Sequence, residues 1–257
     1  FPEVFGAVES LDAQTGRSLE DWQTFYDGAD RMIWHLKEVG YRGVAVTCVS
    51  DGTALYPSHH VQPFPKHDRG IFFSSGQDPI RKDVLELLFR MFDREGLVLV
   101  PTVEFAAPLP ELERILLTAN SEGVRLENRN RVPHTSVVPP NRGRAAYYNP
   151  LDLRVQRAMQ NVIREIVTRY GKHASFGGVA INLRPDGFTQ LPDENWGVDP
   201  ATWSRFCHDR KKKVGVNELT EPVRQEWLDW RCEQLRHLYG QMANEIQTRQ
   251  AKARLYL

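Results

Sequence analysis

The sequence predicts an α/β fold in which parallel strands alternate with crossover helices. Two observations support this class. Short apolar runs alternate with amphipathic stretches along almost the whole chain, which is the pattern of successive strand and helix units. The apolar runs are nearly continuous and do not alternate with polar residues, which indicates a sheet that is covered on both faces.

Five apolar runs are predicted strands, over residues 3–10, 43–50, 97–105, 177–183 and 253–257. Pro101 lies in the third run, where its missing N–H group is unfavourable for the middle of a sheet. Apolar residues at helical spacing predict helices over residues 22–36, 84–92, 109–117, 155–170 and 227–246. Residues 118–147 are polar, rich in Arg, Asn and Pro, and without clear periodicity, so we expect a long insertion there.

Two architectures fit this alternation: a TIM-type (β/α)8 barrel and an open doubly wound sheet. No glycine-rich G-x-G-x-x-G or G-x-x-x-x-G-K-[ST] phosphate loop follows any predicted strand, and this favours the barrel. About five of the eight β/α units are visible. We therefore expect residues 1–257 to form a single barrel domain that is either incomplete or continues after Leu257.

Bulk composition limits the partners. The chain has 33 basic and 33 acidic residues, so it has no net charge to attract nucleic acid or an anionic membrane. Its apolar runs are far shorter than the roughly 20 residues of a membrane-spanning helix. We expect no nucleic-acid partner and no membrane span, and the oligomeric state is left open. No signal peptide is visible, but the chain begins at Phe1, so export to a bacterial periplasm or the extracellular space stays open.

The sequence indicates no metal and no other cofactor. The three cysteines match no zinc motif. His59, His60, His67 and Asp68 resemble a metal cluster in composition, but adjacent histidines on a regular element cannot both face one ion. This stretch is therefore interpreted as a surface loop.

Acidic residues stand at or just after the C-terminal ends of the first four predicted strands: Glu9, Asp51, Glu104 and Asp186. Side chains alternate between the two faces of the fourth strand, so Asn182 lies on the face opposite to Ile181. If the strand continues to Arg184, this side chain lies on the same face as Asn182. Barrels of this type keep their active sites at this edge. A helix cap is the structural alternative for each acid.

Three stretches carry a resemblance to a family. They are "YYNPLDLRVQRAMQNVIREIVTRYGKHASFGGVAINL", "EWLDWRCEQLRHLYGQM" and "DGTALYPS". The first resembles the region of bacterial glycoside-hydrolase-like, family-10-like barrels where an N-P motif opens the helix before the fourth strand. The second is similar to their W-x-x-W-R helix, and the third to a sugar-facing loop. The resemblance covers the chain from about Tyr41 to Leu257.

This resemblance implies a (β/α)8 barrel that acts on an oligo- or polysaccharide, with an acid/base after the fourth strand and a nucleophile after the seventh. The first position corresponds to the loop from Arg184 to Trp196. The Asn-Glu pair that ends the fourth strand in such families is replaced here by "NLRPDG". The candidate acid is therefore Asp186, nearest the strand end, or Glu194, further along the loop, and the expected nucleophile falls beyond these residues.

Glycoside hydrolysis needs one protonated carboxyl and a second carboxylate that attacks carbon or activates water. Phe188 and Trp196 could supply the apolar surroundings that raise the pKa of the acid. Glu9, Asp51, Glu104, Asn182 and Arg184 are candidate sugar-binding residues, and Tyr148 and Trp196 could stack on a sugar ring.

Two other functions remain open at this point. The missing late strands and the absent Asn-Glu pair favour a catalytically silent glycan-binding or scaffold barrel. A barrel lyase or isomerase for a small phosphorylated substrate would need a phosphate-binding loop after the late strands.

Overall fold

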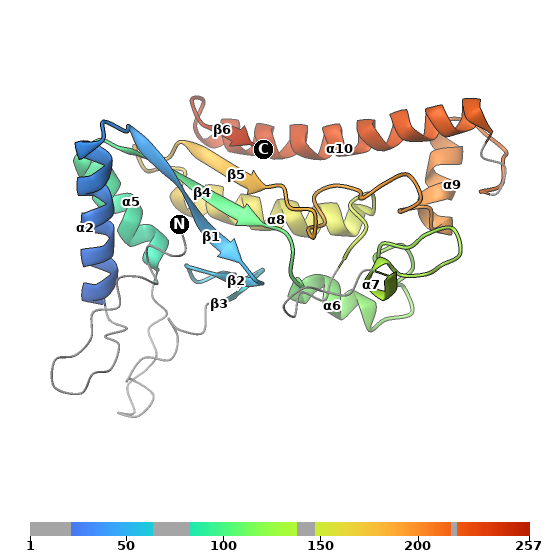
Figure 1. The fold of residues 1–257 in the computed structure, drawn as a ribbon, viewed down its shortest axis with the longest axis horizontal. Coiled ribbons are helices and arrows are strands. Elements are labelled where there is room, and N and C mark those ends of the chain that lie inside the picture. Colours follow the sequence, from blue (N-terminus) through green and yellow to red (C-terminus); the bar gives the residue numbers. More distant parts are fainter. Residues whose placement is uncertain (1–21, 64–82, 138–146, 217–219) are drawn as a thin grey trace. The chain divides into compact units, whose positions relative to one another are not determined.

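The computed structural model describes residues 22–63, 83–137, 147–216 and 220–257 (Figure 1). The predicted strand at 3–10, with Glu9, lies outside the described residues, as do His67 and Asp68. The chain divides into two compact units. The first comprises Phe1–Val103, Glu165–Ile181 and Ile246–Leu257, and the second comprises Glu104–Arg164 and Asn182–Glu245.

The described strands form a mixed sheet in the order β3-β2-β1-β4-β5-β6. They are β1 (Gly43–Ser50), β2 (Thr53–Ala54), β3 (Gln62–Pro63), β4 (Val98–Glu104), β5 (Gly178–Asn182) and β6 (Arg254–Tyr256). β4 is parallel to β1 and β6 is parallel to β5, whereas β2 is antiparallel to β1. The predicted strands at 43–50, 97–105, 177–183 and 253–257 are confirmed, and Pro101 is paired with Val46 inside β4.

The strands β1, β4, β5 and β6 lie side by side in the order in which they occur in the chain. A doubly wound sheet reverses its strand order at a switch point between parallel strands. On the other side of β1 lie only the two-residue strands β2 and β3, and β2 is an antiparallel hairpin partner of β1, so the four longer strands show no such reversal. They follow one another as successive β/α units do in part of a barrel. Within the described residues the sheet is open, with β3 and β6 at its edges.

The end of β1 differs from the predicted alternation. The register with β4 shifts between Thr47 and Val49, so Cys48 is the extra residue of a bulge. The alternation of side chains is therefore interrupted between Thr47 and Asp51. Asp51 (φ 50°) and Gly52 (φ 76°) form the two-residue turn that joins β1 to β2, and such turns favour an Asp-Gly pair because both residues need positive φ.

The helices of the first unit bury one apolar face. They are α2 (Trp22–Glu38), α5 (Val84–Glu95) and the C-terminal ends of α8 (Leu153–Tyr170) and α10 (Glu221–Arg249). α5 begins where the Asp83 carboxylate accepts the N–H of Glu86 at 2.9 Å, and ends at Gly96 in the left-handed conformation. Phe89 of α5 stacks on Tyr170, with ring centroids 5.2 Å apart, and is fully buried.

The second unit contains further helices: α6 (Pro110–Leu116), α7 (His134–Val137), α9 (Pro200–Asp209) and most of α8 (Leu153–Tyr170) and α10 (Glu221–Arg249). The predicted helices at 109–117, 155–170 and 227–246 are confirmed, and α10 begins earlier than expected. α9 was not predicted. Residues 118–137 of the expected insertion form turns, isolated bridges and α7.

The core of the second unit between α9 and α10 is aromatic. Trp227 and Trp230 of α10 stack with centroids 5.3 Å apart, and Phe206 of α9 packs edge-on against both. The two tryptophans of the W-x-x-W-R motif are therefore core residues, each about 1% exposed. The motif therefore packs α10 against α9, and its rings are not available to a ligand.

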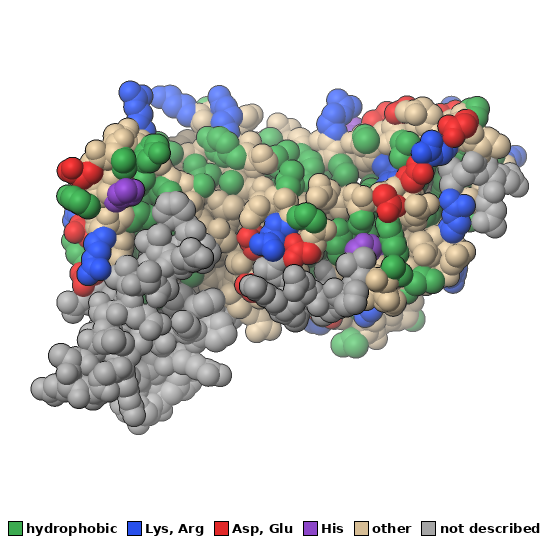
Figure 2. Space-filling model, in the orientation of Figure 1, with side chains coloured by type: hydrophobic (Ala, Val, Ile, Leu, Met, Phe, Trp, Pro, Cys, Tyr) green, Lys and Arg blue, Asp and Glu red, His purple; other side chains and the backbone are tan. Residues whose placement is uncertain are grey.

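The surface carries both signs of charge. Figure 2 shows basic and acidic side chains interspersed among hydrophobic ones on the face in view, as the balanced composition requires. Among the described residues, no helix combines the length and the apolar character needed to cross a membrane.

Candidate functional site

Polar side chains meet where β4 and β5 end. Asn182, the last residue of β5, donates a hydrogen bond from Nδ2 to Oε1 of Glu104, the last residue of β4, at 2.8 Å. Nη1 of Arg184 lies 3.7 Å from the same oxygen. Because the side chain of Glu104 is only 9% exposed, its carboxylate depends on these donors. The structure therefore joins two of the predicted strand-end residues in one contact.

Arg184 extends this contact to Asp186. Its Nε donates to Oδ1 of Asp186 at 2.9 Å and its Nη2 to Oδ2 at 3.4 Å. This two-point geometry is the one in which a guanidinium best stabilises an ionised carboxylate. Glu104, Asn182, Arg184 and Asp186 thus form a continuous group, here called the strand-end cluster. The Asp186 side chain remains about one-third exposed, so a ligand can reach it.

The loop that carries Asp186 is fixed by backbone contacts. The N–H of Gly187 donates to the carbonyl of Arg184 at 3.0 Å, and the N–H of Phe188 donates to the carbonyl of Phe105 at 2.8 Å. The rings of Phe105 and Phe188 lie 5.8 Å apart, and Phe188 is fully buried. Gly187 is required by this approach, since a Cβ there would lie 2.9 Å from the carbonyl oxygen of Phe105.

Glu194, the other candidate acid, lies in a different contact. Its Oε2 is 2.6 Å from Nη2 of Arg224 in α10, and its side chain is 37% exposed. The structure brings Asp186 together with Glu104, Asn182 and Arg184, and pairs Glu194 with Arg224. Both candidate acids therefore face an arginine.

The predicted stacking residues Tyr148 and Trp196 are buried. The Tyr148 hydroxyl donates to Oε1 of Glu113 at 2.6 Å and accepts from the N–H of Leu109 at 3.1 Å. Burial, together with the hydrogen bond to Glu113, raises the pKa of Tyr148, so its hydroxyl stays protonated. Trp196 is 8% exposed and meets the ring of His134 edge-on at 4.6 Å.

The neighbouring Tyr147 was not predicted as a site residue. Its hydroxyl donates to the carbonyl of Pro185 at 3.2 Å. Burial, and secondarily the negative charge of Asp186, raises the pKa of Tyr147 to about 12, so it remains a hydrogen-bond donor at neutral pH. Its ring centroid lies 4.2 Å from that of His134. The pair Tyr147-Tyr148 is the sequence signal that could have identified Tyr147. Adjacent side chains in an extended segment face opposite sides, so the two rings meet different surroundings.

Tyr147 also lines a cavity of about 200 Å³ in the second unit. The cavity is bounded by both tyrosines of the pair, by residues of α6 and α7, and by two residues of the connecting segments. These residues are Pro108, Glu113, Leu116, Arg125, Thr135, Tyr147 and Tyr148.

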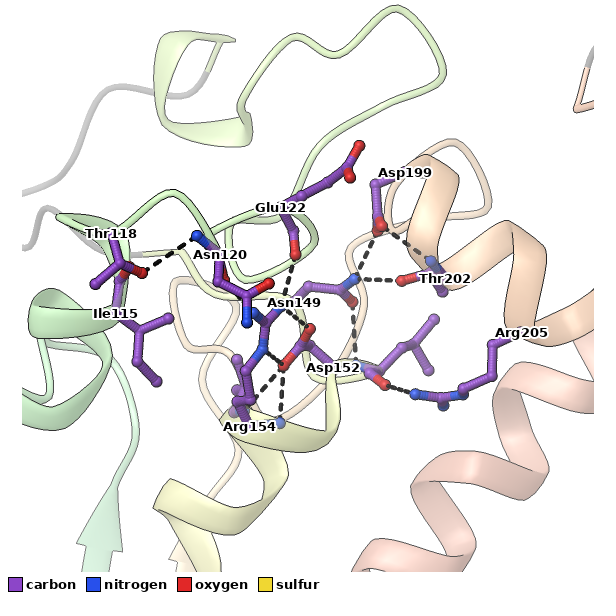
Figure 3. A network of polar contacts seen from close by, with 12 residues as sticks. Ile115, Thr118, Asn120, Glu122, Asn149, Asp152, Arg154, Asp199, Thr202 and Arg205 are labelled. Carbon is purple, nitrogen blue, oxygen red and sulfur yellow. Dashed lines mark hydrogen bonds and ion pairs between the residues drawn. The ribbon is translucent and has the colours of Figure 1, made fainter.

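The N-P motif has a structural role in the second unit (Figure 3). The buried Asn149 donates from Nδ2 to Oδ2 of Asp199 and to Oγ1 of Thr202, both at 2.9 Å, and its Oδ1 accepts the N–H of Leu151. These bonds join the segment before α8 to the start of α9. Arg154 at the start of α8 donates to the carbonyl of Glu122 at 2.5 Å, so the same network secures the insertion.

The remaining predicted site residues lie elsewhere. Asp51 is an exposed turn residue of the first unit, and Glu9 lies outside the described residues. In the parts of the chain that the structure describes, no three His, Cys, Asp or Glu side chains are grouped so that they could hold a metal ion.

The strand order and the polar strand ends define an α/β protein with a candidate site at the ends of β4 and β5. Residues 19–255 match the family model described as glycosyl hydrolase-like 10. The chain belongs to this family, and the resemblance inferred from the sequence is confirmed. No curated protein sequence matches the chain.

Two solved structures are similar in fold. One is α-L-fucosidase isoenzyme 2 from Paenibacillus thiaminolyticus, with 8% identity and a TM-score of 0.57 over 89% of this chain and 28% of that one. The other is the β-galactosidase from the psychrophilic Marinomonas ef1, with 12% identity and a TM-score of 0.55 over 91% of this chain and 35% of that one. The chain thus spans about a third of the length of either relative.

Proposed function

We propose that the protein is a carbohydrate-active (β/α)8 barrel that hydrolyses a glycosidic bond at the C-terminal ends of its strands. The observation that carries this proposal is the strand-end cluster. Carboxylate, amide and guanidinium groups from β4, β5 and the following loop converge at the edge where barrels of this class hold their substrates. Membership of the glycosyl hydrolase-like 10 family supports the same activity.

The barrel itself is part of the proposal. Strand order that follows chain order supports successive β/α units of a single domain over residues 1–257. The two similar structures extend well beyond the matched region, which is consistent with further units that complete such a barrel.

Asp186 and Glu194 are the proposed catalytic carboxyls. Hydrolysis needs a proton donor and a second carboxylate. Asp186, nearer the strand end, and Glu194, further along the loop, are the two candidates for the proton donor. Glu104, Asn182 and Arg184 would bind sugar hydroxyls. Glu9, Asp51, Tyr148 and Trp196 stay predictions, since Glu9 lies outside the described residues, Asp51 belongs to the first unit, and Tyr148 and Trp196 are buried.

The test uses the full-length protein and a panel of aryl glycosides that includes fucosides and galactosides. With an accepted substrate, Asp186→Asn or Glu194→Gln should lower kcat/KM at least about 100-fold, because each removes a group that acts in the transition state. Asp30→Asn and Glu38→Gln are matched controls on exposed positions of α2. The proposal fails if both site variants hydrolyse the substrate as fast as the controls.

A glycan-binding protein without turnover is the second candidate. It is favoured by one observation: both candidate acids are engaged by arginines, Asp186 by Arg184 and Glu194 by Arg224. Oligosaccharide titration of the full-length protein separates the two functions. Binding that is weakened by Arg184→Ala, with no product after prolonged incubation, would identify the binding protein.

A further inference from the structure

The cavity beside Tyr147 has the size of a single sugar ring. Its volume is about 200 Å³, many times the roughly 10–15 Å³ of such volume that one water molecule needs. Pockets for drug-sized ligands begin at roughly 300 Å³. A monosaccharide unit fits this space, whereas an extended oligosaccharide would have to pass outside it.

The lining combines apolar surface with opposite charges. Pro108, Leu116 and the two tyrosine rings supply the apolar part, and Glu113, Arg125 and Thr135 supply polar groups. A pyranose has the same division, with C–H faces and a rim of hydroxyls. The carboxylate of Glu113 accepts from hydroxyls, the guanidinium of Arg125 donates to them, and Thr135 does both.

The charges of the lining select a neutral ligand. The charges of Glu113 and Arg125 cancel. Both residues are exposed, which places them at the solvent side of the cavity. The carboxylate of a uronic acid could pair with Arg125 but would also meet the like charge of Glu113. A purely apolar ligand would make no use of the hydrogen-bonding groups of Arg125 and Thr135.

Tyr147 connects the cavity with the strand-end cluster. Its ring lines the cavity, and its hydroxyl donates to the carbonyl of Pro185, the residue between Arg184 and Asp186. All of these residues belong to the second unit. A ring held in the cavity would therefore lie next to the loop that carries Asp186.

We infer that this cavity is a subsite for one neutral pyranose unit of the glycan, bound by Arg125, Glu113 and Thr135 and packed against Pro108, Leu116 and Tyr147. The inference rests on the proposed function and deepens it. It assigns the substrate a neutral sugar unit at this position and assigns Arg125 the role of a binding residue.

The experiment is a titration of the full-length protein with methyl glycosides of galactose, glucose, mannose and fucose, and with methyl glucuronide, followed by saturation-transfer NMR. At least one neutral glycoside should bind. Arg125→Ala should weaken its binding at least about tenfold, as expected for loss of a hydrogen bond from a charged donor, and Thr135→Trp, which fills the cavity, should abolish it.

Two matched variants control for indirect effects. Arg129→Ala removes an exposed arginine of the same segment, and Leu117→Ala removes an 88% exposed side chain next to Leu116. Both should bind as the wild type does. Circular dichroism verifies the fold of every variant, and if Thr135→Trp does not fold, Arg125→Ala against Arg129→Ala decides. The inference is overturned if no neutral glycoside binds, if only the glucuronide binds, or if Arg125→Ala binds like Arg129→Ala.

Failure of this inference and failure of the proposed function give different results. If hydrolysis is lost in Asp186→Asn but unchanged in Arg125→Ala and Thr135→Trp, the result supports the proposed hydrolase and contradicts the subsite. If a neutral glycoside binds in a way that depends on Arg125 and no glycoside is hydrolysed, the result supports the subsite and contradicts the proposed hydrolase.

Discussion

Asn182 and Glu104 lie 78 residues apart in the sequence and are joined by a 2.8 Å hydrogen bond. Each is the last residue of its strand, and the two strands are neighbours in the sheet. The amide of Asn182 supplies a donor without a charge, so it supports the carboxylate of Glu104 while Arg184 contributes the positive charge nearby. The contact fixes the relative position of the two strand ends on which the candidate site is built.

Asn182→Asp should destabilise the protein, because it places a second carboxylate against Glu104. Like charges that face each other on neighbouring strands are destabilising, by up to about 1 kcal/mol, and the loss should shrink in 1 M salt, which screens the repulsion. Urea unfolding at pH 7 in low and high salt measures both effects. Asn130→Asp, at an exposed position, is the control, and an equal change in the two variants would contradict the assigned contact.

Gly187→Ala should destabilise the loop that carries Asp186. The new Cβ would lie 2.9 Å from the carbonyl oxygen of Phe105 and 3.3 Å from that of Arg184, and both are backbone atoms that cannot turn aside. Overpacking of this kind costs about 1–3 kcal/mol. The control is Gly240→Ala in α10, where nothing lies within 4 Å of the added atom.

For Gly240→Ala the opposite sign is expected, with a gain of about 0.5–1 kcal/mol from higher helix propensity. Thermal and urea unfolding of the two variants give the comparison. If Gly187→Ala were as stable as the wild type, the close approach of the loop to Phe105 would not be as described.

Much of the fold was predictable because its signals are local. Continuous apolar runs located β1, β4, β5 and β6, and helical spacing located α2, α5, α6, α8 and α10. The missed α9 had a readable start, since Asp199 followed by Pro200 is a favourable helix beginning and the Asp199 carboxylate caps it. The bulge at Cys48 could not be predicted, because it is defined by the pairing of β1 with β4.

The candidate site was predictable in its residues and not in its pairings. Strand-end position indicated Glu104, Asn182, Arg184 and Asp186, and the structure brings these four together. The pairing of Glu194 with Arg224 depends on where α10 passes the loop, and burial of Tyr148 beside α6 depends on the course of the insertion. These are tertiary contacts between segments 30 or more residues apart, which no local pattern encodes.

Arg231→Met should destabilise the second unit by about 2–4 kcal/mol. The guanidinium is 5% exposed, donates to the carbonyl of Asp193 at 2.7 Å and lies over the ring of Trp227. Burial lowers the pKa of Arg231 to about 10, so the group is still charged at neutral pH. Its removal leaves a carbonyl without its donor and removes a cation–π contact.

Arg236→Met on the exposed side of the same helix is the matched control, and its stability should stay within about 0.5 kcal/mol of the wild type. Because Asp193 precedes Glu194, Arg231→Met should also loosen the segment that carries this candidate acid, measurable as faster amide exchange there. Equal unfolding midpoints for the two variants would contradict a role for Arg231 in holding the loop.

Protonation of His134 should make the second unit less stable in mild acid. Burial against Tyr147 and Trp196 lowers the pKa of His134 below its ordinary value of 6.5, and the charge of Asp193 only partly opposes this. Between the lowered pKa and 6.5 the unfolded chain binds a proton that the folded chain does not, so stability decreases as the pH falls through this window. His134→Phe keeps a ring in place and should flatten the urea-midpoint profile between pH 5 and pH 7.5, whereas His237→Phe, at an exposed position, should leave the wild-type slope. Identical slopes in His134→Phe and the wild type would show that another group titrates in this range.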